Sequence, residues 1–325
     1  MRKGYGLDMK EENCVKEVLW TTCRMTSNAR GFIIVRNNAM RCKEMTMEPI
    51  ENLSQIIVDI HNQRIKVMEY DSDQIDEIAK SCKQQADKLG MTKLIVYARH
   101  EDLSAWEKHG FVREGILEGC MNGQNAHMLR YFVTSERGTP KNEPLADEIL
   151  QISLAKQATN SVCKELPDDC RVRWAKLEDA EELAKLYQVV FETYQTPMHD
   201  PEYVRTTIQA DTYYAVVEAG GQIVCAASAE VTPNWGSAEM TDCATHPKWL
   251  GKGLLQHLFV ALEQHMQEIG ISYLYTLTRA HSAAMNVTAA KMGYRYTGRL
   301  INNCVISTGF EDMNIWVKPL KAVWD

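Results

Sequence analysis

Apolar residues recur at helical spacing late in the chain. The stretch 254–269 places its large apolar side chains on one side of a helix, because residues three or four positions apart share a helix face. That face is formed by Leu255, Leu258, Leu262, Met266 and Ile269. The same spacing in Leu183, Leu186 and Val190 predicts a helix after a short strand at 171–176.

Short runs rich in β-branched and aromatic residues surround these helices. Two of them, 212–219 and 222–231, flank Gly220-Gly221 and are typical of a hairpin. Further strands are expected at 237–245, 271–278, about 295–306 and 311–318, with a helix at about 282–292. Strands and helices in this order predict an α/β (α+β) fold.

The chain also contains an internal repeat. LGMTKLIVYAR (89–99) resembles IGISYLYTLTR (269–279), and each is followed by a helix and then by KHGFVREG (108–115) or KMGYRYTG (291–298). In both copies the Gly-to-Arg spacing is nine residues and the later Gly-to-Gly spacing is five. We therefore expect two halves with related α/β cores.

A polar segment with two prolines, TSERGTPKNEPL at 134–145, reads as a linker, and a connecting helix is expected at 146–160. Residues near the start are polar and predict mobility. The expected organisation is a mobile arm at 1–30, an N-terminal domain at 31–135, a linker and connecting helix at 136–165, and a second domain at 166–325.

Composition narrows the class of protein. Of 325 residues 45% are hydrophobic, the net charge is −7 and the basic residues are scattered, so we expect no nucleic-acid partner. Ten cysteines without CxxC spacing predict reduced thiols, no metal site and a cytoplasmic protein. No signal-like segment and no run of about 18 apolar residues is present, so no membrane association is expected.

The candidate chemistry begins with HPKWLGKGLLQHL at 246–258. Gly251 and Gly253 flank Lys252 where a helix starts, and the first amides of a helix attract anions. The alternative is that the glycines only make a tight turn. The spacing fits neither a Walker loop nor a dinucleotide-binding fingerprint.

The equivalent stretch of the first half, 64–90, has no glycine between its strand and its helix. Asp71, Asp73 and Asp76 stand there instead, and carboxylates at a helix start repel an anion. Only the second half is therefore expected to bind a phosphorylated coenzyme.

Taken with the order of elements, THPKW (245–249), LGKGLL (250–255) and KMGY (291–294) resemble the GNAT acetyltransferase family over about 165–320. The pattern departs from the family at Leu250 and Leu255. The resemblance implies a mixed, mostly antiparallel sheet flanked by helices, acetyl-CoA as co-substrate, and a catalytic domain at 166–325. The N-terminal domain would then be a degenerate GNAT-like half without the coenzyme loop.

The segments 275–316 and 110–132 further resemble β-lysine N6-acetyltransferases. This resemblance implies transfer of acetyl to the ε-amine of (3S)-β-lysine, which gives the osmolyte Nε-acetyl-β-lysine. Two alternatives stay open: an acetyltransferase for a polyamine or lysine-like amine, and a non-catalytic acyl-CoA sensor, which Leu250 and Ala289 favour. A small-molecule amine is the expected partner, and the oligomeric state is open, with a homodimer as one option.

The resemblance also implies coenzyme contacts. A backbone N–H near Ala244 or Thr245 would stabilise the oxyanion. Ser282 stands where the family has an asparagine, and Asn286 either points into the same cleft or is a solvated helix position. The expected coenzyme-binding residues are Ala244, Thr245, Leu250, Gly251, Lys252, Gly253, Leu254, Leu255, Ser282 and Asn286.

An alkylammonium acceptor has a pKa near ~10.4 and must lose a proton before it attacks. Glu239 and Asp242 are candidate bases, although residues three apart on a regular strand face opposite sides unless a bulge intervenes. Glu230 is a third candidate, and any of these carboxylates could instead bind the substrate's ammonium groups.

Ala289 occupies the position of the family's usual tyrosine acid, so the leaving thiolate would depart unprotonated or use Tyr294, Tyr296 or water. Asn302 and Asn303 lie in an otherwise buried strand, and one should face inward. That side chain would bind the substrate's carboxylate or amine, or else cap a backbone group.

Overall fold

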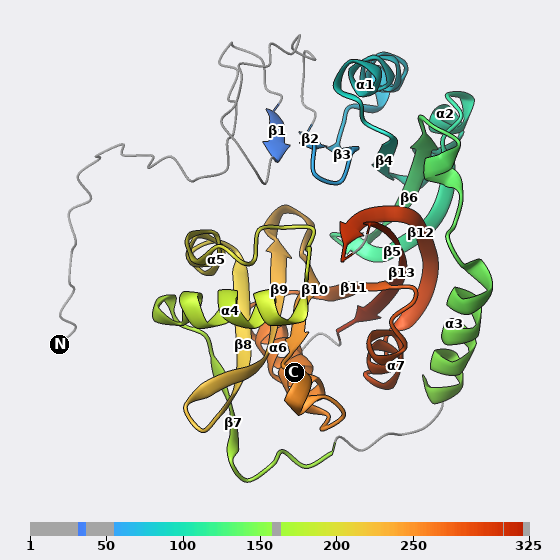
Figure 1. Ribbon diagram of the computed structural model, residues 1–325. Helices are drawn as coiled ribbons and strands as arrows, with labels where there is room; N and C mark the ends of the chain where they lie inside the picture. Colours follow the sequence, from blue (N-terminus) through green and yellow to red (C-terminus); the bar gives the residue numbers. More distant parts are fainter. Residues whose placement is uncertain (1–31, 37–54, 158–163, 308, 321–325) are drawn as a thin grey trace, which may run out of the picture.

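The computed structural model describes the backbone of 32–36 and the full residues 55–157, 164–307 and 309–320 (Figure 1). The arm expected at 1–30 and part of the expected linker lie outside the described residues.

One continuous sheet runs through both halves of the chain. The first half contributes β1 (Phe32–Arg36), β2 (Gln55–Asp59), β3 (Arg64–Glu69), β4 (Lys93–Ala98), β5 (Val112–Met121) and β6 (Gln124–Phe132). The second contributes β7 (Cys170–Trp174), β8 (Thr212–Ala219), β9 (Gln222–Thr232), β10 (Ser237–Thr245), β11 (Tyr273–Arg279), β12 (Arg295–Ile306) and β13 (Gly309–Pro319). The strand order is β1-β2-β3-β4-β6-β5-β12-β13-β11-β10-β9-β8-β7.

Neighbouring strands are mostly antiparallel. Only β1–β2, β3–β4 and β10–β11 pair in parallel among the described strands. Seven α-helices accompany the described sheet: α1 (Ile75–Leu89), α2 (Leu103–Lys108), α3 (Glu143–Gln157), α4 (Ala180–Val190), α5 (Pro201–Ile208), α6 (Leu254–Glu268) and α7 (Ala283–Lys291). The expected mixed, mostly antiparallel α/β fold is confirmed.

The two halves share one topology. The order β2-β3-β4-β6-β5 in the first half matches β9-β10-β11-β13-β12 in the second, with the same parallel and antiparallel neighbours. Helices α1 and α2 follow β3 and β4 as α6 and α7 follow β10 and β11. The repeated sequence blocks therefore correspond to repeated structure.

The halves join at their two repeated glycines. Gly115 of β5 pairs with Gly298 of β12, each beside a bulge. A Cβ on Gly298 would lie 2.3 Å from the Glu114 carbonyl oxygen and 2.4 Å from the Gly115 Cα. Real Cβ atoms do not approach backbone so closely, so the junction requires glycine at this position.

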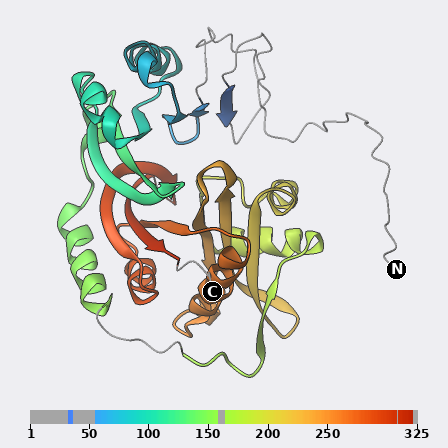
Figure 2. The same ribbon diagram turned by 180° about the vertical axis from the view of Figure 1, so that it is seen from behind.

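Helices cover both faces of the second half's sheet. Helix α6 buries Leu258, Phe259 and Leu262 against one face, and α4 buries Leu183 and Leu186 against the other. Figure 1 shows α4 in front of these strands, and Figure 2 shows α6 in front when the molecule is turned. The apolar helix faces expected from the spacing are thus confirmed for most of their residues, but Ile269 lies just beyond α6 and is exposed.

The connecting helix α3 packs against α7. The Asp147 carboxylate binds the Arg299 guanidinium at 2.7 Å, and the Gln157 side chain donates to the Tyr294 carbonyl. The helix begins at Glu143, three residues before the expected start. These contacts show that α3 packs on the outside of the second half.

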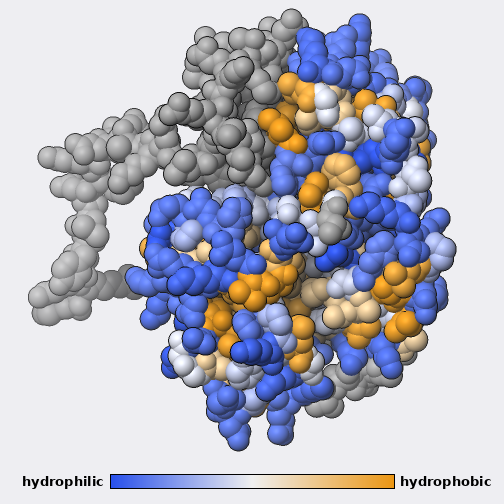
Figure 3. Space-filling model, in the orientation of Figure 1, coloured by the Kyte–Doolittle hydropathy of each residue, from blue (hydrophilic) through white to orange (hydrophobic). Residues whose placement is uncertain are grey.

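The surface is mainly hydrophilic on the face of Figure 1, where apolar residues gather in several small groups (Figure 3). Among the described residues, no helix combines the length and the apolar character needed to span a bilayer.

Candidate active site

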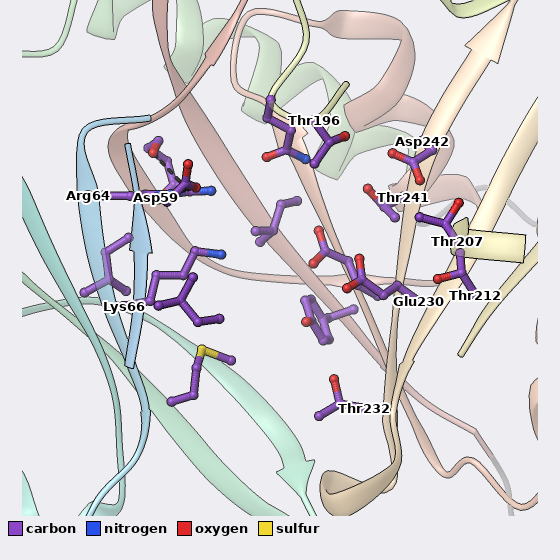
Figure 4. Close-up of a pocket in the computed structure, with 18 of the residues that line it drawn as sticks. Asp59, Arg64, Lys66, Thr196, Thr207, Thr212, Glu230, Thr232, Thr241 and Asp242 are labelled. Atoms are coloured by element: carbon purple, nitrogen blue, oxygen red, sulfur yellow. Dashed lines mark hydrogen bonds and ion pairs between the residues drawn. The ribbon is translucent and has the colours of Figure 1, made fainter. Parts of the chain in front are cut away.

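A cavity of about 220 Å³ lies between the two halves of the sheet. Strands β2, β3 and β4 form one wall, β9, β10 and β11 form the facing wall, and residues from 195–210 close it. Figure 4 shows Asp59, Arg64 and Lys66 on the first wall and Glu230, Thr241 and Asp242 on the other. Such a concave, polar-lined space suits a small ligand.

A bulge in β10 shapes the second wall. Thr241 pairs with Ser228 and Ala244 with Ala226, so β10 carries one extra residue between these pairs. Asp242 sits there at φ 50°, a left-handed conformation that costs a non-glycine residue roughly 1–2 kcal/mol. As a result, Glu239 and Asp242 both line the cavity, although a regular strand would separate them.

Hydrogen bonds hold Asp242 in this conformation. The Ser228 hydroxyl donates to its carboxylate at 2.8 Å, and the buried Tyr187 hydroxyl donates to its carbonyl at 2.8 Å. Burial raises the pKa of Asp242 to about 6, against the Ser228 hydrogen bond and helped by the charge of Glu230. Asp242 is therefore a proton acceptor that still titrates near neutral pH.

Glu239 lies directly opposite Glu230 in the β9–β10 ladder. Burial, followed by repulsion from Glu230, raises the pKa of Glu239 to about 7, while the positive charge of Lys66 opposes this rise. A group with this pKa can take a proton and release it again at physiological pH. The pKa values of both candidate bases thus lie above those of ordinary carboxyl groups and closer to neutral pH.

The glycine loop lies at the same end of β10 as the bulge. Gly251 and Gly253 have φ of 77° and 80°, and Gly253 is the N-cap of α6. The amide of Gln256 already donates to the Gly253 carbonyl, so the amides of Leu254 and Leu255 are the ones that the start of α6 offers to an anion. The Lys164 ammonium donates to the Gly251 carbonyl at 2.8 Å, and Lys252 lies over the Trp249 ring. These features fit a phosphorylated coenzyme.

The flanking leucines contribute in different ways. Leu250 is 64% exposed at the surface of the loop. Leu254 is buried in the core and Leu255 packs against that core, so only their backbone amides can face a ligand.

Strands β10 and β11 diverge beside the loop. They pair only from Ser237 to Glu239, while β9 continues to pair with β10 through Ala244 and Thr245. Because successive amides of a strand point to opposite edges, one of the Ala244 and Thr245 N–H groups faces β9 and the other faces the gap. One of these two N–H groups therefore points away from β9, and its role at the oxyanion stays a prediction.

The corresponding turn of the first half is built differently. Asp71 accepts from the Asp73 amide and caps a short 3-10 helix. The Asp102 carboxylate accepts from Tyr70, Ser72 and Arg99, which ties these residues into one polar cluster. The absence of a coenzyme loop here remains a prediction that this geometry supports.

The expectation for Asn286, which lies in α7, is wrong. It is fully buried, and its side-chain oxygen accepts from Thr278, Asn314 and Trp316. Its side-chain nitrogen donates to the carbonyls of Arg279 and Ser282. Asn286 is thus neither a coenzyme contact nor a solvated helix position, because its hydrogen-bonding capacity is used within the core. Ser282, the N-cap of α7, stays partly exposed.

The positions considered for a general acid lie in the core. Ala289 and Tyr294 are buried beneath α6, and Tyr296 packs against the same cluster. Burial raises the pKa of the Tyr294 hydroxyl well above its usual value. None of the three reaches the cavity lining.

The two asparagines of β12 separate as expected, with one facing inward. Asn303 lines the cavity, and its side-chain oxygen is buried without a hydrogen-bond partner among the described residues. Asn302 instead donates to the carbonyls of Arg137 and Thr139, which lie in the segment between the two halves. The expected substrate contact is wrong for Asn302, whose side chain caps neighbouring backbone.

The first wall carries charged residues that the sequence did not single out. The Arg64 guanidinium pairs with Asp59 at 2.9 Å and donates to the Asn303 carbonyl. Lys66 lies one alternation further along β3. The pattern Arg64-x-Lys66 was a usable signal, because residues two apart on a strand share a face. The pattern could be interpreted as part of a site only after the structure showed that this face of β3 lines a cavity.

In the parts of the chain that the structure describes, no three His, Cys, Asp or Glu side chains are grouped so that they could hold a metal ion.

Comparison with known proteins agrees with this geometry. The family described as "Acetyltransferase (GNAT) family" matches residues 177–294. The N-acetyltransferase YodP of Bacillus subtilis is 37% identical over 81% of this chain and 94% of its own. The β-lysine N(6)-acetyltransferases of Methanosarcina mazei and Methanococcus maripaludis are 35% and 31% identical, over 75% and 84% of this chain and 97% and 99% of theirs.

These relatives span both halves, and the matched segment contains the bulged strand, the glycine loop and α7. The chain therefore belongs to the GNAT family of acetyltransferases and is an N-acetyltransferase that uses acetyl-CoA.

Proposed function

We propose that this enzyme transfers acetyl from acetyl-CoA to the ε-amine of (3S)-β-lysine and forms Nε-acetyl-β-lysine. The observation that carries the proposal is the group of three carboxylates, Glu230, Glu239 and Asp242, on one wall of a small cavity that also bears a cation on the facing wall. The names of the two archaeal relatives give the same acceptor.

The coenzyme would be held by backbone groups. The amides that open α6 after Gly251 and Gly253 bind its diphosphate, and Ser282 lies on the path of its arm. Acetyl-CoA supplies the activated acyl group. The gap beside Ala244 and Thr245 provides a backbone N–H for the acyl oxygen as it gains negative charge.

The carboxylates make the acceptor amine reactive. Glu239, with Asp242 as the second candidate, accepts a proton from the ε-ammonium, directly or through water. The amine nitrogen then forms a bond to the acyl carbon, the carbon–sulfur bond breaks, and the nitrogen loses its second proton to water as the amide forms. A thiol with a pKa near ~8.5 leaves tolerably as thiolate, so the core position of Ala289 does not prevent the reaction.

The product chemistry suits a compatible solute. Acetylation removes one positive charge from β-lysine, and one ammonium and one carboxylate remain, so the product has no net charge. We therefore infer a role in osmoadaptation in the cytoplasm. We likewise infer that 166–325 is the catalytic domain, that 136–165 joins it to 31–135, and that the latter supplies the facing wall of the acceptor cavity.

The test is thiol release by the full-length protein with acetyl-CoA and (3S)-β-lysine, with the acetylated nitrogen located by NMR. Steady release and an Nε-acetyl product are expected. Turnover with spermidine but not with β-lysine would instead support a polyamine acceptor, which the three carboxylates also favour. No release with any amine would indicate an acyl-CoA sensor.

A further inference from the structure

Lys66 is the residue of the facing wall that the proposed chemistry does not yet use. Along β3, Arg64, Lys66 and Met68 line the cavity, while Ile65 and Val67 are buried against α1. Figure 4 shows the Lys66 side chain reaching from β3 into the cavity, toward the wall that carries Glu230.

The internal repeat shows which residue of the second half corresponds to Lys66. Lys66 pairs with Ile95 on β4, and Glu239 pairs with Tyr275 on β11. Ile95 and Tyr275 occupy the same place in the two sequence blocks, because each lies five residues after the glycine that starts its block. Lys66 is therefore the structural equivalent of Glu239, and the two halves place a cation and an anion at one repeated position around the same cavity.

Arg64 is the other cation of this wall. Arg64 is buried, pairs with Asp59 and donates to the Asn303 carbonyl, so it holds the wall together. Setting that pair aside, the cavity offers three carboxylates on one side and the Lys66 ammonium on the other. A diamino acid has the complementary charges, two ammonium groups and one carboxylate.

We propose that Lys66 binds the carboxylate of a diamino-acid acceptor and so orients the chain of the acceptor toward Glu239. This rests on the proposed function and names the group that separates an amino acid from a polyamine. The first half of the protein would then determine acceptor specificity, while the second half performs the transfer.

The test compares each acceptor with the same molecule lacking its carboxylate. The kcat/KM values for β-lysine and for 1,4-diaminopentane are measured in the full-length wild type and in Lys66→Met. A charge-assisted contact predicts that the wild type prefers β-lysine by about 10- to 100-fold and that Lys66→Met loses most of this preference. Lys66→Arg should keep part of it, and Lys80→Met, which removes an exposed lysine of α1, should keep all of it.

The ratio of kcat/KM for β-lysine to kcat/KM for 1,4-diaminopentane is the quantity that tests the role of Lys66. Removing Lys66 also removes a charge that lowers the pKa of Glu239, but that effect acts on both acceptors and cancels in their ratio. An equal fall in kcat/KM for both acceptors would overturn the proposal.

A failure of the proposed function can be distinguished from a failure of the proposal for Lys66. If lysine replaces β-lysine as the acceptor, that function is wrong, and the same ratio of lysine to 1,5-diaminopentane decides the role of Lys66. If the wild type acetylates only amines without a carboxylate, both proposals are wrong.

Discussion

Glu230 and Glu239 face each other directly across the β9–β10 ladder, two carboxylates on one wall of the acceptor cavity. Like charges at opposed positions of a sheet repel, and the charge of Glu230 makes the ionised form of Glu239 less favourable. The pKa of Glu239, at about 7, is partly a consequence of this pairing. The strand register thereby adjusts the proton affinity of the proposed base.

Glu239→Gln keeps the shape of the side chain and removes its ability to accept a proton. We expect kcat to fall by about 10²- to 10⁴-fold, with partial recovery at high pH, where more of the amine is free. Initial rates of thiol release between pH 6 and 10 measure this. Asp242→Asn is the matched comparison, and a larger loss there would assign the base to Asp242.

Glu230→Gln should move the pH profile. Activity requires ionised Glu239, so kcat/KM rises with pH through its pKa. Without the neighbouring negative charge that pKa falls, and the acid limb shifts from about 7 toward lower pH. Glu178→Gln removes a carboxylate on the exposed turn before α4 and should leave the profile unchanged. An unshifted limb in Glu230→Gln would show that the pairing does not act on the base.

Gly253→Ala tests the coenzyme loop. The alanine must adopt φ near 80° and would place its Cβ 3.3 Å from the Lys164 side chain, so the strain falls on the loop whose amides are proposed to bind the coenzyme. We expect the Kd for CoA, measured by calorimetry, to rise by about tenfold or more. Gly220→Ala is the control: the β8–β9 turn also has positive φ but no atom close by. Both variants should lose about 1–2 kcal/mol of unfolding free energy, and only the first should lose affinity.

Gly298→Ala should damage the junction between the halves. Its Cβ would overlap the backbone of Glu114 and Gly115, which cannot move without breaking strand pairing. We expect a loss at the upper end of the roughly 1–3 kcal/mol typical of overpacking, or more, measured by denaturant unfolding. Gly90→Ala, at φ 65° in open space, provides the strain-only comparison. Equal losses in the two variants would contradict the tight contact.

Much of the fold follows from local signals. The Gly220-Gly221 turn, the strand 237–245 and the apolar face around Leu258 and Leu262 are found where their patterns predict, because each depends on residues close in sequence. The repeat predicted two related halves. It gave no indication that Gly115 would pair with Gly298, because that contact joins distant segments.

The site depended more on tertiary contacts. Glu239 and Asp242 were recognisable as candidates, but the left-handed Asp242 is held by Ser228 and Tyr187 from other elements. Asn286 looked like a surface or cleft residue, and contacts from β11 and β13 place it in the core instead. Lys66 gained a role only when the two halves were seen to enclose one space.

The close backbone contact at Gly115 and Gly298 also has a geometric consequence. Since Gly298 carries no side chain, the backbones of β5 and β12 can approach this closely, and the two walls of the cavity, on β3 and β10, belong to one continuous sheet. An acceptor that reaches from Lys66 to Glu239 is then held between two strands of one sheet, and the flexible Lys66 side chain is the part that can adjust to its length.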